Sequence, residues 1–143
     1  MDMAKFEEEV NKLKTLEKDR EKYFTSRQEM EMRLTESRNV KAELDLMDSD
    51  SKVYKLIGAV LVRQELEEAR STVEKRLEFI ESEIKRVESS IADVVKKSTE
   101  QREKVMNMQK AFQVLAQQQA AAAQKNKSSL FVSSFRISFM FFL

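Results

Sequence analysis

The segment 53–62 is the feature that most constrains the fold of this chain. It contains the only glycine, Gly58, and its other residues are, except for Lys55, β-branched, aromatic or aliphatic. On both sides the sequence changes to Glu, Lys, Arg and Gln, spaced as in helices. A glycine at the first position of a two-residue turn favours a type II′ β-hairpin, because that position has a positive φ. The order therefore predicts a helix, a two-stranded hairpin and a second helix.

Both flanking stretches carry heptad patterns. In the second, steps of four and three residues from Val73 select positions that are all apolar except Ser98 and Gln101, a period typical of a left-handed coiled coil. These two polar residues either loosen the packing or fix the register. In the first stretch the same alternation is less apolar and includes cations, whose aliphatic stems can cover the seam. Its positions are Phe6, Glu9, Leu13, Leu16, Arg20, Tyr23, Arg27, Met30, Leu34, Ser37, Lys41 and Leu44.

The two helical arms are expected to fold back on each other. We expect arms over 4–47 and 65–124, joined by a hairpin over 52–64 and forming one domain over 1–127. The stretches 4–47 and 65–112 are similar in length, which favours an antiparallel pair with Phe6 near Met106 and Met108, and Met3 near Phe112. Apolar residues at the far end either only close the last turns of the seam or form an adaptable binding tip, for which flexible Met is suited. They are Met3, Phe6, Val10, Met106, Met108, Phe112 and Leu115.

The predicted hairpin has apolar residues on both faces. A lone two-stranded hairpin is marginal in water, and its edges invite the addition of further strands. Joining hairpins of other subunits in a shared sheet or barrel would cover the apolar faces and pair the edges, whereas an irregular connector is the simpler alternative. The expected oligomerisation residues are Val53, Tyr54, Leu56, Ile57, Gly58, Val60, Leu61 and Val62.

Composition argues against several classes of function. The chain has no His or Cys, which removes the usual zinc, haem and thiol chemistry and the commonest general base. We therefore expect no catalytic residues, no metal and no cofactor. Cations and anions nearly balance and are interleaved along the arms, unlike the basic footprint of a nucleic-acid binder. The N-terminus lacks the apolar run of a signal peptide, which favours a cytoplasmic protein without a membrane partner.

From Lys52 to Arg70 the sequence KVYKLIGAVLVRQELEEAR resembles the hairpin and second-helix start of β-class prefoldin subunits. The following KRLEFIESEIKR, residues 75–86, is similar to the subunit-six branch of that family in eukaryotes. The resemblance covers about residues 5–120. Members often have Pro after the hairpin glycine, where this chain has Ala59.

The resemblance implies a fold, partners and a function. The fold is a mainly α chain, an antiparallel two-helix coiled-coil hairpin whose β-hairpin joins an oligomeric β-barrel. The partners are other prefoldin subunits in a heterohexamer, non-native clients such as actin and tubulin, and the cytosolic type II chaperonin. The hexamer captures the clients and delivers them to the chaperonin without using ATP. Segment 53–62 would then serve assembly and the tip residues would contact client. A structural coiled-coil tether without chaperone activity is the alternative.

The C-terminal segment 128–143 departs from the polar tail that family members tend to have. It holds five of the nine Phe and is interrupted by Arg136 and several Ser. Sixteen residues of this kind are too short for a membrane span. Three interpretations stay open: a disordered or variant terminus, an extra client-binding segment, or a tail that touches a membrane. The composition is aggregation-prone when exposed, which favours a variant terminus.

Overall fold

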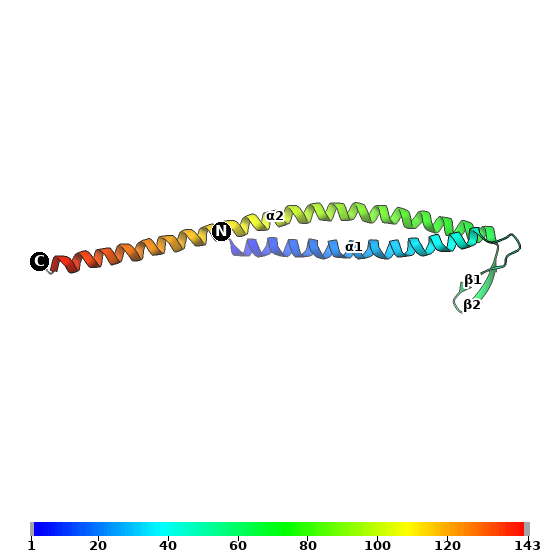
Figure 1. The fold of residues 1–143 in the computed structure, drawn as a ribbon, viewed down its shortest axis with the longest axis horizontal. Coiled ribbons are helices and arrows are strands. Elements are labelled where there is room, and N and C mark those ends of the chain that lie inside the picture. The colour runs from blue at the N-terminus through cyan, green and yellow to red at the C-terminus, as the bar shows by residue number, and fades with distance from the viewer. Residues whose placement is uncertain (1, 142–143) are drawn as a thin grey trace. The chain divides into compact units, whose positions relative to one another are not determined.

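The computed structural model describes residues 2–141, and their order is helix, two strands, helix (Figure 1). Helix α1 spans Met3–Asp45, strands β1 and β2 span Val53–Ile57 and Val60–Gln64, and helix α2 spans Leu66–Phe141. The predicted mainly α fold with a β-hairpin between the arms is confirmed. Helix α1 begins with an N-cap, because Asp2 Oδ1 accepts a hydrogen bond of 3.0 Å from the Ala4 backbone N–H.

The heptad seams predicted from the sequence coincide with the residues that the structure buries. Every seam position of the first arm from Phe6 to Leu44 is buried or half-buried, and so is every one of the second arm from Val73 to Phe112. The cationic seam positions Arg20, Arg27 and Lys41 are half-buried too, as expected if their aliphatic stems cover the seam. The period of 3.5 residues was therefore a reliable guide to the inner face of both helices.

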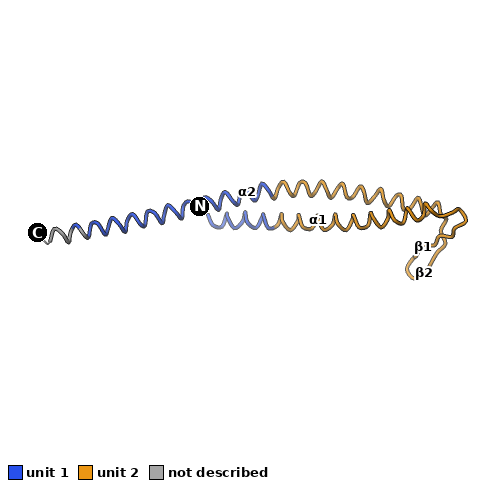
Figure 2. The backbone as a smooth tube through the Cα atoms, viewed as in Figure 1, with its two compact units in different colours: residues 1–14, 99–143 blue, residues 15–98 orange. Residues whose placement is uncertain are grey.

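The chain divides into two compact units, which Figure 2 colours separately. Unit 1 comprises Met1–Lys14 and Thr99–Leu143, and unit 2 comprises Thr15–Ser98. In unit 2, α1 and α2 pair antiparallel: Arg27 bonds to Glu88 at 2.8 Å and Arg38 to Glu81 at 3.1 Å. The division falls inside both helices, so it does not coincide with the boundary expected between a domain and its tail.

Helix α2 is longer than the sequence predicted. The second arm was expected to end near residue 124 and to be followed by a disordered or variant tail, whereas α2 continues through residues 128–141. No Pro or Gly follows Gly58, and the run 120–123 is entirely Ala, the residue with the highest helix propensity. Nothing in the local sequence therefore stops the helix. From residue 113 to residue 134 all its side chains are exposed.

Candidate functional site

The β-hairpin has the turn that its glycine predicted. Strands β1 and β2 pair antiparallel, with Ile57 opposite Val60 and Val53 opposite Gln64, which leaves Gly58 and Ala59 as the two turn residues. Gly58 has a φ of +60°, and no non-glycine residue among the described ones has a positive φ. A positive φ at the first turn position alone fits a type II′ turn, since type I′ requires it at both.

Apolar side chains project from both faces of the hairpin into solvent. Because side chains alternate along a strand, Leu56 and its partner Leu61 share one face, while Ile57 and Val60 share the other. Leu56 is 67% exposed and Val60 61%. The sheet has two strands, so each strand also has an outer edge with no partner among the described residues. The hairpin therefore offers apolar faces and free edges together.

A small core anchors the hairpin to the helix ends of unit 2. Leu44, Leu66 and Ala69 are buried together, and Val53 and Val73 pack against them. Of the eight residues proposed for oligomerisation, only Val53 at the base of the hairpin contacts this core. The others lie on the free part of the hairpin. The core thus fixes the base of the strands and leaves their apolar faces uncovered.

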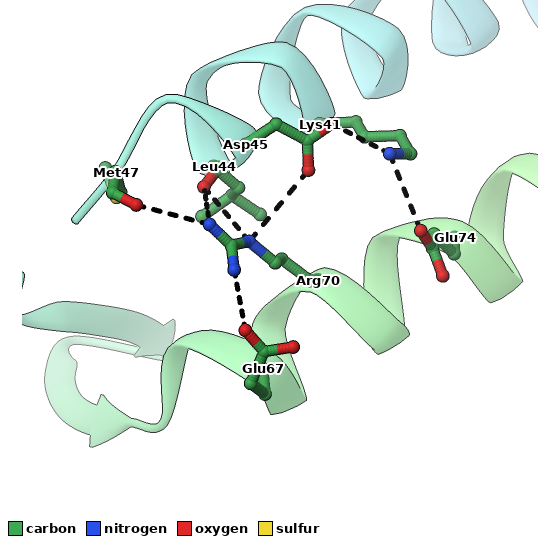
Figure 3. A network of polar contacts seen from close by, with 7 residues as sticks. All are labelled: Lys41, Leu44, Asp45, Met47, Glu67, Arg70 and Glu74. Carbon is green, nitrogen blue, oxygen red and sulfur yellow. Dashed lines mark hydrogen bonds and ion pairs between the residues drawn. The ribbon is translucent and has the colours of Figure 1, made fainter. Parts of the chain in front are cut away.

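Arg70 of α2 closes the C-terminal end of α1, as Figure 3 shows. Its guanidinium donates to the Leu44 carbonyl through Nη2 at 2.9 Å and Nε at 3.2 Å, and to the Met47 carbonyl at 3.2 Å. Arg70 Nη1 donates to Glu67 Oε1 at 2.6 Å, and this hydrogen bond holds the planar guanidinium in place. The last carbonyls of a helix lack partners within the helix, and Arg70 supplies donors to two carbonyls at this end.

Sequence reasoning missed Arg70, although one signal was available. Helices often end on a glycine, but the only glycine of this chain is used in the hairpin turn. At the end of α1 the backbone N–H groups of Leu46 and Met47 bond the nearest carbonyls, and a cation in the first turns of α2 can add further donors without a glycine. Sequence alone does not say which cation does so. Beside Arg70, Lys41 bridges Asp45 at 2.8 Å and Glu74 at 3.5 Å, which ties the same helix ends together (Figure 3).

Unit 1 contains the end of the paired arms, residues 3–14 of α1 and 99–115 of α2, which we call the arm end. It brings aromatic residues of both helices together. The rings of Phe6 and Phe112 meet edge to face, with centroids 5.3 Å apart and planes at 79°. Phe6 was expected beside Met106 and Met108; the ring contact with Phe112 differs from that register by about one helical turn. Val10 and Met108 are half-buried, whereas Met3, Met106 and Leu115 are 66%, 47% and 43% exposed.

A buried carboxylate lies on the seam of unit 1, close to these rings in sequence. Glu9 has only 5% of its side chain exposed. Gln101 Nε2 donates to Glu9 Oε2 at 2.6 Å and to the Glu9 backbone carbonyl at 2.9 Å. Lys104 and Lys12 lie at 2.9 and 3.3 Å from the other carboxylate oxygen. The hydrogen bond from Gln101, followed by that from Lys104, lowers the Glu9 pKa from its ordinary value of 4.5 to about 2.

The Glu9 cluster explains one polar interruption of the second seam. Of the two roles considered for Gln101, a fixed register fits the geometry, because its amide reaches a single backbone carbonyl and side chain on α1. Ser98 is 3% exposed and donates to the Val95 carbonyl of its own helix at 3.1 Å. Its hydroxyl thereby has a hydrogen-bond partner within α2 itself. The two adjacent polar positions therefore differ in role.

The residues predicted for the tip are only partly brought together. The structure joins Phe6 to Phe112 directly, and sequence reasoning missed Val114, which is 51% exposed one turn beyond Lys110. Among the described residues no group of three His, Cys, Asp or Glu side chains could hold a metal ion. Within the same part of the chain no helix is long and apolar enough to cross a membrane.

Comparisons with known proteins agree on one family. A family model described as "Prefoldin subunit" matches residues 7–112. A probable prefoldin subunit 6 of Caenorhabditis elegans is 84% identical over 124 residues, which cover 87% of this chain and 98% of the relative. Human prefoldin subunit 6 is 49% identical over 109 residues, covering 76% and 84% respectively.

A solved structure has the same fold. The crystal structure of the prefoldin beta subunit from Thermococcus strain KS-1 superposes with a TM-score of 0.67. The superposition covers 72% of this chain and 90% of that chain, at 17% sequence identity. At this identity the likeness supports the fold, whereas the family rests on the sequence matches.

Proposed function

The chain belongs to the prefoldin family, as a β-class subunit similar to subunit 6, and we propose that it is one subunit of a hexameric chaperone. The hairpin of segment 53–64 joins the β-hairpins of the other subunits, and the arm end binds non-native polypeptides. The complex works without ATP in the cytosol and passes clients such as actin and tubulin to the type II chaperonin. No catalytic step is involved.

The observation that carries this proposal is the uncovered hairpin. Two five-residue strands present apolar side chains on both faces, with Leu61 65% and Ile57 56% exposed. Single exposed apolar residues are ordinary, but a contiguous set on a short sheet with free edges supports a protein interface. Hairpins from several subunits can cover these faces and pair these edges. A structural tether gives no reason for an apolar connector between its arms.

Client binding is proposed for the end of the arms in unit 1. The arm end combines a ring pair, Phe6 and Phe112, with exposed Met3 and Met106. Methionine adapts its shape to varied apolar surfaces, which suits a site for unfolded chains of differing sequence. Each such site binds weakly by itself. Several sites held on one platform raise the affinity, because the later contacts occur at a high effective concentration.

Co-expression with the other five subunits tests the proposal. The chain is purified with its partners, and the mass of the particle is measured by light scattering after size exclusion. We expect a stable particle that contains one copy each of six different chains. A chain that elutes alone while the other five associate without it would contradict the proposal. The same measurement on a chain ending at Lys127 shows whether residues 128–143 interfere with assembly.

A further inference from the structure

The balance of charges changes abruptly along α2. The whole chain has 26 cations and 25 anions, but no Asp or Glu follows Glu103. In unit 2, cations of α1 pair with carboxylates of α2, as Arg38 does with Glu81 and Arg27 with Glu88. Carboxylates are absent from the sequence 104–143, which carries five cations, Lys104, Lys110, Lys125, Lys127 and Arg136. The cations in this part of α2 therefore have no carboxylate of their own segment to pair with. Lys104 instead contacts Glu9 of α1.

One of these cations lies between two exposed apolar residues. Met106, Lys110 and Val114 are spaced four residues apart, so they form one row on the surface of α2. All three are exposed, Met106 at 47% and Val114 at 51%. Phe112, which contacts Phe6, is two residues from Lys110 and so points to a different side of the helix. Among the described side chains Lys110 has no carboxylate partner.

We propose that the row Met106, Lys110 and Val114 binds segments of non-native polypeptide in which an acidic residue lies between apolar ones. This inference rests on the proposed chaperone function and names the client sequence that the arm end prefers. An acidic side chain would meet Lys110 while its apolar neighbours cover Met106 and Val114. Charge complementarity of this kind adds selectivity to contacts that apolar residues alone would make without preference.

Other occupants of the row fit less well. A second copy packed along the same stretch of α2 would bring cation against cation, because the sequence 104–143 has no Asp or Glu. The row carries no aromatic ring on which a nucleic-acid base could stack. A lipid surface would meet the cations but not the short alternation of apolar, cationic and apolar side chains. An acidic polypeptide segment satisfies all three positions.

Binding of matched peptides to the particle that the full chain forms with its five partner subunits tests the inference. Two labelled, unstructured peptides share length and apolar residues, and differ only in carrying Glu or Gln at the central positions. Fluorescence anisotropy gives the dissociation constant of each. We expect the Glu peptide to bind about fivefold tighter, which is the scale of one exposed ion pair, and the preference to shrink as salt is raised. Lys110→Arg should keep the preference and Lys110→Glu should abolish it.

The matched control is Lys85→Glu, which changes the net charge equally at an exposed position of α2 in unit 2. It should leave the preference intact. Equal binding of both peptides, or equal loss in the Lys85→Glu variant, would overturn the inference. Binding to anionic phospholipid vesicles through Lys110 without preference for the Glu peptide would overturn it too and indicate a lipid partner. If neither peptide binds, the failure lies with the proposed client function, which is distinguishable from a mere lack of preference.

Discussion

The hairpin and the arm end both expose apolar residues, but they differ in what else they present. The hairpin offers β-strand edges whose backbone groups have no partner among the described residues, so a neighbour must match a defined hydrogen-bond register. The arm end is formed by helices, in which backbone groups beyond the first turn of α1 bond within the helix, and it offers mainly side chains. Strand edges with a defined hydrogen-bond register suit a fixed protein partner. Flexible side chains suit partners whose sequences vary.

The two regions also differ in how their surroundings hold them. A core of Leu44, Leu66 and Ala69, closed by Arg70, fixes the base of the hairpin. A ring pair and the hydrogen-bonded Glu9 hold the arm end. Because the two regions share none of these contacts, each of them can be altered without disturbing the other.

The largest effect is expected from charges placed on the hairpin. Leu56→Lys combined with Val60→Lys adds a cation to each face of the sheet, so that neither face can be buried against a neighbour without desolvating a charge. Assembly should weaken by more than about a hundredfold, while helix content by circular dichroism stays unchanged. Met32→Lys, on an exposed position of α1, is the control. An intact hexamer in the double variant would contradict the assembly role proposed for the hairpin.

Arg70→Ala should cause the next largest effect. It removes the guanidinium donors from the Leu44 and Met47 carbonyls, although the Leu44 carbonyl keeps the Met47 backbone N–H at 3.3 Å. Losing hydrogen bonds from a charged donor costs about 2 kcal/mol. The free energy of unfolding from urea titration measures this. Arg70→Lys should recover only part of it, because an ammonium cannot reproduce the fork of the guanidinium. Exposed Arg86, which bonds Glu83 within α2, is the matched control, and Arg86→Ala should change stability little.

A smaller effect is expected when the arm end loses its apolar side chains. Phe6→Ser, Met106→Ser and Phe112→Ser together should weaken client capture about tenfold in the assembled particle, because the other subunits still contribute sites. The mass of the particle should stay the same. Suppression of aggregation of a denatured client measures capture. A triple variant that no longer assembles would show that the two regions are not separable in the proposed way.

The smallest effect concerns acid. The Glu9 pKa is lowered to about 2 in the folded chain, so between pH 4.5 and 2 the unfolded chain binds more protons. The stabilisation from Glu9 is therefore fully present above pH 4.5 and is lost as the pH falls through about 2. The urea midpoint should decline over this window in the parent chain and less so in Glu9→Gln. Equal declines in both would contradict the role given to Glu9.

Much of the fold was predictable because it follows from periodicity and one glycine. The seam positions were predicted down to the cations Arg20 and Lys41, and the turn followed from Gly58. Individual side-chain contacts at the arm end were not, because a heptad pattern does not say how far a side chain reaches along the seam: Phe6 meets Phe112, one turn beyond the expected Met108, and Gln101 reaches the Glu9 carbonyl. The continuation of α2 was missed because the apolar composition of segment 128–143 outweighed the lack of helix breakers.

Hydrogen–deuterium exchange on the chain in three states tests the division of roles most directly: alone, in the assembled particle, and in the particle with a denatured client. We expect assembly to slow exchange over 53–64, and the client to slow exchange over 3–14 and 99–115 while exchange in the hairpin stays unchanged. Protection of the hairpin by the client, or of the arm end alone on assembly, would contradict this division of roles.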